Sequence, residues 1–81
     1  MTKERDKDYI AAVGRRLRQL REACGLSMEK VLFLKNVYLF EIEDGRRNIT
    51  VSTLIALCEA YGISLHEFYK GLEYNDTADS Q

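Results

Sequence analysis

The chain has 81 residues, of which 46% are hydrophobic and 31% charged, a composition typical of one small folded domain rather than a disordered segment. This length excludes a large two-domain enzyme, and no apolar run approaches the eighteen or so residues that a membrane-spanning helix needs. One histidine and two cysteines are too few for a zinc finger, so we expect no metal site and no cofactor. With no export signal at the charged N-terminus, we expect reduced cysteines and a cytoplasmic location.

The formal net charge of −1 is spread unevenly along the chain. Residues 1–25 carry seven Lys or Arg against four Asp or Glu, residues 26–50 carry four of each, and residues 51–81 carry one against five. One end of the molecule could therefore face a polyanion while the other stays away from it. Solvated helix faces would give the same pattern, so charge alone does not decide between the two interpretations.

The first predicted helix runs from about Asp8 to Cys24, after a frayed or disordered segment of residues 1–7. Its apolar stripe repeats at steps of three and four residues and consists of Ile10, Val13, Leu17, Leu20 and Cys24. Gly14 costs up to about 1 kcal/mol against alanine inside a helix, so it indicates a close approach by another helix. Gly25 then ends the helix.

Serine and threonine residues mark the starts of the later predicted helices. Ser27 is a suitable N-cap for a segment that ends at Gly45, and Thr50 is a suitable N-cap for the helix that follows. Ser64 with Glu67 three residues later forms a capping-box pattern, which predicts a last short helix.

These elements together predict an all-α domain of four or five helices over residues 8–72. A polar C-terminal tail, residues 73–81, follows it. No proline, internal repeat or linker divides the chain.

Three stretches carry a family resemblance. They are GRRLRQLR at residues 14–21 with GLS at 25–27, YLFEIEDGRRN at 38–48, and LIALCEAYGISL at 54–65. In this order the chain resembles the Xre, or lambda-repressor-like, helix-turn-helix family over about residues 10–72. The resemblance implies a compact five-helix fold, transcriptional regulation without catalysis, double-stranded DNA as the partner, and a homodimer.

The resemblance also assigns roles to individual residues. Arg21 and Glu43 match a pair that joins helices 1 and 3 in the family, and such a partly buried pair fixes orientation. Arg46, Arg47 and Asn48 match a loop that abuts the DNA backbone, where guanidinium and amide groups are apt donors to phosphate oxygens.

The chain departs from the family between Ser27 and Gly45, a spacing about three residues shorter than is typical, without the usual turn glycine. Two structures follow. In one, a cramped turn near Lys35 and Asn36 keeps two short helices, since asparagine tolerates the left-handed conformation. In the other, residues 28–44 form one helix about 25 Å long. That helix would be apolar on every side, so it predicts a domain-swapped oligomer.

Four side chains are candidates for reading bases in the major groove: Lys35, Asn36, Tyr38 and Glu41. Lysine can donate to guanine, asparagine can pair with adenine, and glutamate can accept from cytosine, although Glu41 also repels phosphates. Phe40 could meet a thymine methyl group or a protein partner.

The last predicted helix is the expected dimer interface, because it holds more apolar surface than so short a helix can bury alone. The residues concerned are Leu65, Phe68, Tyr69 and Leu72. An alternative function is an oligomerising or protein-binding variant of the same fold that no longer binds DNA. The shortened turn, the acidic isoelectric point near 5.8 and the apolar run at residues 31–42 favour that alternative.

An enzyme is the remote third class. His66 stands alone within the capping box and is interpreted as a helix-start residue. Cys24 and Cys58 fall on apolar stripes and are interpreted as buried core thiols. No nucleophile elbow, phosphate-binding glycine loop or paired-histidine motif occurs, and no small-molecule site is legible.

Overall fold

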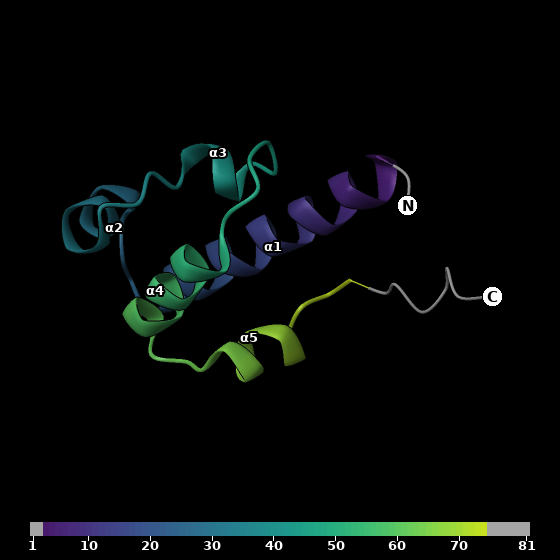
Figure 1. The fold of residues 1–81 in the computed structure, drawn as a ribbon. Coiled ribbons are helices and arrows are strands. Elements are labelled where there is room, and N and C mark those ends of the chain that lie inside the picture. The colour runs from purple at the N-terminus through teal and green to yellow at the C-terminus, as the bar shows by residue number, and fades with distance from the viewer. Residues whose placement is uncertain (1–2, 75–81) are drawn as a thin grey trace.

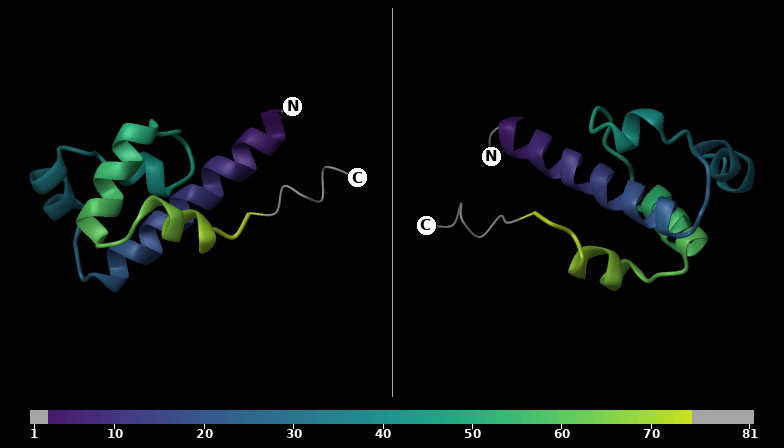
Figure 2. Two further views of the ribbon diagram at one scale, coloured as in Figure 1. Left: turned by 60° about the horizontal axis from the view of Figure 1, so that its bottom comes forward. Right: turned by 180° about the vertical axis from the view of Figure 1, so that it is seen from behind.

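The computed structural model describes residues 3–74, and over that range the protein is a bundle of five α-helices without a strand. The helices are α1 (Lys3–Ala23), α2 (Met28–Lys35), α3 (Phe40–Glu43), α4 (Val51–Tyr61) and α5 (Leu65–Lys70). The long helix α1 crosses the molecule, with α3 on one side of it and α5 on the other (Figures 1 and 2). The predicted all-α, five-helix fold is confirmed.

Helix α1 begins at Lys3, earlier than the expected Asp8, so residues 3–7 are helical rather than frayed. The periodicity could not show this, because the segment is charged and extends no apolar stripe, although lysine, glutamate and arginine are good helix formers. The expected polar tail lies almost wholly outside the described residues, which end at Tyr74. No helix in the described range is long and apolar enough to cross a membrane.

Helix α4 contributes four side chains to the core, and each of the other elements contributes one or two. Its buried members are Val13, Leu17, Val31, Leu39, Ile42, Leu54, Leu57, Cys58, Tyr61 and Phe68. Phe68 has no exposed surface, because the six-residue helix α5 inserts this one ring between its neighbours. The expectation that Phe68 lies at a dimer interface is therefore wrong: its apolar surface is already used within the monomer.

Gly14 lets α1 and α3 touch backbone to backbone. A Cβ at this position would overlap the carbonyl oxygen of Ile42 and lie 2.9 Å from that of Glu43. The close helix approach predicted from a mid-helix glycine is confirmed, and its partner is the short helix α3.

The chain turns at Asn36, which ends α2 in the left-handed conformation with φ 58° and ψ 39°. The Asn36 backbone N–H donates to the carbonyl oxygen of Leu32 at 2.8 Å, which closes the last turn of α2. The alternative of one continuous helix over residues 28–44 is therefore wrong for this structure. Helix α3 holds only four residues, which fits the shortened spacing between Ser27 and Gly45.

The predicted capping residues occupy the helix starts. Ser27 accepts from the backbone N–H of Lys30 at 3.0 Å, and Thr50 accepts from that of Thr53 at 3.1 Å. The capping box at α5 is complete, because the Ser64 hydroxyl accepts from the Glu67 N–H and the Ser64 N–H donates to the Glu67 carboxylate.

One contact that positions α5 was not predicted. The Arg16 guanidinium reaches from α1 to α5 and donates to the carbonyl oxygens of Glu67 and Phe68 at 3.2 and 3.3 Å. It lies 5.9 Å from the centre of the Phe68 ring as well. A basic residue that donates to late helix carbonyls complements the helix dipole, so Arg16 fastens the end of α5 to α1.

Candidate nucleic-acid interface

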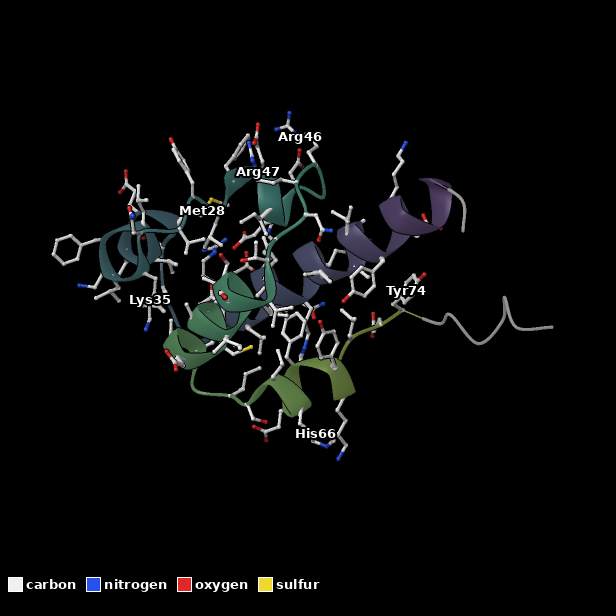
Figure 3. All side chains as sticks on the ribbon, in the orientation of Figure 1. Met28, Lys35, Arg46, Arg47, His66 and Tyr74 are labelled. Carbon is white, nitrogen blue, oxygen red and sulfur yellow. The ribbon has the colours of Figure 1, made fainter. Side chains whose placement is uncertain are left out.

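Helix α3 and the loop after it form one exposed face. Figure 3 shows Arg46 and Arg47 projecting from this loop to the same side of the molecule. Tyr38, Phe40 and Glu41 are exposed beside them. A groove of about 620 Å³ lies between α3 and the start of α4. Its apolar lining includes Val37, Ile42 and Ile49, and its polar lining includes Glu41, Arg47 and Asn48.

A buried ion pair fixes α3 against α1. The Arg21 guanidinium binds the Glu43 carboxylate through two parallel bonds, Nε to Oε2 at 2.7 Å and Nη2 to Oε1 at 2.9 Å. The two residues are only 9% and 8% exposed. The hydrogen bond to Glu43 raises the pKa of Arg21 above its ordinary value. This is the pair that the family resemblance implied, and its fork geometry sets both the position and the rotation of α3.

The Arg21 side chain also organises the turn after α1. Its Nη1 donates to the carbonyl oxygen of Leu26 at 2.8 Å. One guanidinium therefore fixes the relative positions of the end of α1, the start of α2 and the end of α3.

Both arginines of the loop are paired with acidic neighbours. Arg47 donates from Nε and lies within 3.0 Å of the Glu41 Oε1 atom through both Nε and Nη2. Arg46 Nε lies 2.6 Å from Asp44 Oδ2, and its guanidinium stacks 5.4 Å from the centre of the Phe40 ring. The Asn48 side-chain oxygen accepts from the backbone N–H of Ile49 at 2.9 Å, which leaves its NH₂ group exposed.

The structure does not bring all the predicted DNA-contacting residues together. Tyr38, Glu41 and Arg47 line the groove with Asn48, and Arg46 stands beside it. Lys35 points away from this face in Figure 3, and its Nζ lies 3.6 Å from the Glu59 carboxylate of α4. Asn36 has a structural role as the residue that turns the chain, with its side chain exposed.

The remaining residues of the expected dimer interface, Leu65, Tyr69 and Leu72, differ in exposure. Tyr69 is exposed, and its hydroxyl lies 3.1 Å from that of Tyr9 on α1. Leu65 and Leu72 are half-buried against the core. Part of the apolar run at residues 31–42 is exposed: Leu32, Phe33 and Leu34 on α2, here named the α2 apolar patch, of which Phe33 is 82% exposed.

The two cysteines differ in exposure. Cys58 is buried in the core, and burial raises the pKa of its thiol. Cys24, which follows the last residue of α1, is exposed although its Sγ donates to the carbonyl oxygen of Tyr61 at 3.5 Å, so the interpretation of both cysteines as buried core thiols is wrong for Cys24. His66 lies exposed in the first turn of α5. Over the described residues no group of three His, Cys, Asp or Glu side chains is placed to bind a metal ion.

The comparisons with known proteins agree with this geometry. A family model described as a helix-turn-helix domain matches residues 12–68. The chain therefore belongs to the helix-turn-helix domain family, whose members of the Xre-like type are transcriptional regulators rather than enzymes.

Two relatives show the breadth of the match. The chain is 36% identical over 62 residues to the HTH-type transcriptional regulator DdrOP3 of Deinococcus deserti, a match that covers 73% of this chain and 48% of that protein. The chain thus spans about half the length of this curated relative. The crystal structure of the restriction-modification controller protein C.AhdI from Aeromonas hydrophila is similar with a TM-score of 0.68 and 35% identity, over 73% of this chain and 94% of that one.

Proposed function

We propose that this protein is a sequence-specific DNA-binding transcriptional regulator that acts as a homodimer without catalysis. The observation that carries the proposal is the geometry of one face: α3 is fixed by the Arg21–Glu43 pair, and Arg46 and Arg47 project beside it. The names of both relatives support the same reading. A DNA ligand also implies the cytoplasm as the site of action.

The face divides into two parts with different tasks. Arg46, Arg47 and Asn48 offer guanidinium and amide donors to phosphate oxygens, which position a protein on the duplex without reading its sequence. Tyr38 and Glu41 belong to the α3 side, where they would meet base edges in the major groove.

Fluorescence anisotropy with a labelled duplex of random sequence tests the phosphate contacts. Affinity should fall steeply between about 50 and 200 mM salt, because each phosphate contact releases counterions. Arg46→Ala should weaken binding and reduce the salt slope by about one. Arg18→Ala is the control, since Arg18 is an exposed arginine of α1. Binding that is independent of salt, or that Arg18→Ala weakens as much as Arg46→Ala does, would contradict the proposal.

The dimer is proposed to form through the exposed surface of α5 around Tyr69, together with the exposed parts of the half-buried Leu65 and Leu72. Light scattering after size-exclusion chromatography measures the mass at micromolar concentration. Tyr69→Ser should shift the dimer toward monomer with little loss of stability. A wild-type monomer at these concentrations would refute the homodimer.

A second candidate function rests on the α2 apolar patch. Exposed leucines with a nearly fully exposed phenylalanine on an eight-residue helix favour a protein contact, because contiguous apolar surface is usually covered. In this alternative the protein self-associates or binds another protein through α2 and has lost DNA binding. Self-association that Phe33→Ser abolishes, without any salt-dependent binding to DNA, would favour this second function.

A further inference from the structure

The Glu41–Arg47 pair joins two elements across the proposed DNA face. Glu41 lies on α3, and Arg47 lies in the loop six residues later. Two nitrogen atoms of the Arg47 guanidinium converge on a single oxygen of the carboxylate, both at 3.0 Å. The arginine and glutamate side chains are 65% and 48% exposed, so solvent or a ligand can reach both. One of the two loop arginines proposed to contact phosphate is therefore already bound to an anion on α3.

We propose that Glu41 is a specificity-determining residue. On DNA of arbitrary sequence Glu41 keeps its ion pair with Arg47. Where a base offers Glu41 a hydrogen-bond donor, the ion pair breaks and Arg47 is released. The inference rests on the proposed DNA binding and deepens it. The donor is the amino group of a cytosine, since a carboxylate accepts from cytosine N4 in the major groove.

The exchange follows from the donors and acceptors available. If Arg47 turns toward a phosphate, the Glu41 carboxylate loses its cation and stands close to a polyanion without a partner. On a mismatched sequence this arrangement is unfavourable, because like charges repel and an acceptor is left unpaired. On a sequence with a cytosine in reach, both groups find new partners. One exchange thus couples a phosphate contact to the reading of a base.

A second pair provides a matched control. Arg18 and Glu22 on α1 form an ion pair with Nε 3.1 Å from Oε2, and their side chains are 63% and 56% exposed. The chemistry and exposure resemble those of the Glu41–Arg47 pair. Neither residue lines the groove. Glu22→Gln therefore removes the same charge from the protein as Glu41→Gln without altering the proposed exchange.

The first experiment measures affinity for a labelled duplex of random sequence by fluorescence anisotropy. Glu41→Gln should bind this probe about three- to tenfold more tightly than wild type, a gain of the size expected for losing an exposed ion pair and a repelling charge. Glu22→Gln should change affinity less than about twofold. In an Arg47→Ala background the gain from Glu41→Gln should be smaller than in the wild-type background, because only the repulsion between Glu41 and the phosphates is then removed. Far-ultraviolet circular dichroism checks that each variant is folded.

The second experiment selects bound sequences from a pool of duplexes with randomised bases. Wild type should enrich a cytosine at one position. Glu41→Gln should reduce the preference for cytosine there, since an amide can also donate and can therefore pair with other bases. The inference is overturned if Glu41→Gln weakens binding to random duplex, matches the Glu22 control, or keeps its full gain without Arg47. Failure of every variant to bind DNA would instead overturn the proposed function, and this inference with it.

Discussion

Truncation of Glu43 to alanine leaves the Arg21 guanidinium buried with two of its donors unpaired. The pair is only 9% and 8% exposed and binds through two short bonds, so water cannot readily replace the carboxylate. Removal of one partner from such a pair costs about 3–5 kcal/mol. Arg21 keeps its bond to the Leu26 carbonyl oxygen, which places the expected loss near the lower end of that range.

The size of the domain makes this loss severe. A chain of 81 residues has a free energy of unfolding of about 4–12 kcal/mol. A loss of about 3 kcal/mol corresponds to a fall in Tm of about 12–24 °C at this size. Urea denaturation followed by circular dichroism measures the change, with Glu22→Ala as the control. The exposed Glu22–Arg18 pair should contribute less than about 1 kcal/mol.

A double variant separates the cost of an orphaned charge from the value of the pair. Arg21→Met with Glu43→Leu removes both charges, and it should be less destabilised than Glu43→Ala because no buried charge remains. If Glu43→Ala and Glu22→Ala lose the same stability, solvent reaches the Arg21 site, and the argument that this pair fixes α3 is refuted.

Four further outcomes follow from the structure. Gly14→Ala should cost about 1–3 kcal/mol in urea denaturation despite its better helix propensity, since the added methyl group meets the α3 backbone. At Asn36, glycine should leave stability within about 0.5 kcal/mol, whereas valine should lose about 1–2 kcal/mol, because only glycine accepts the left-handed turn freely. Phe68→Ala should lose about 3–5 kcal/mol of folding stability, and loss of self-association without unfolding would contradict its place in the core. With a chromogenic disulfide reagent, the exposed Cys24 should react at least about tenfold faster than the buried Cys58, and Cys24→Ser should remove the fast phase.

Local signals predicted much of the fold. The stripe of α1, the capping residues Ser27, Thr50 and Ser64, and the close approach at Gly14 all depend on neighbours within one or two turns or on the size of one residue. Such features are written directly in spacing and residue type. They were enough to predict an all-α domain of four or five helices.

The connection between α2 and α3 could not be settled in this way. Its apolar residues follow one another without a clear period, so the pattern fitted both a turn and one long helix. Tertiary packing decides the matter: α2 packs against α4 and α3 packs against α1, and the left-handed residue Asn36 turns the chain between these two contacts.

The candidate site was predicted only where the family motif supplied it. Arg46, Arg47 and Asn48 lie on one face with Tyr38 and Glu41, but Lys35 is bound to Glu59. That contact joins residues far apart in sequence, as does the one between Arg16 and α5. The prediction that Phe68 lies at a dimer interface failed for a related reason. The sequence of an apolar stripe is the same whether its own chain or another chain covers it.

Under the proposed function, the shortness of α3 limits how much DNA sequence one copy of the protein can distinguish. Four residues at 1.5 Å each span about 6 Å, which is about two base-pair steps of 3.4 Å. A sequence of two or three base pairs recurs throughout any genome, so a single copy would bind at almost any position. In the proposed homodimer, selectivity depends on the fixed separation between the two copies of α3, so the contact that sets this separation governs which DNA sites are bound.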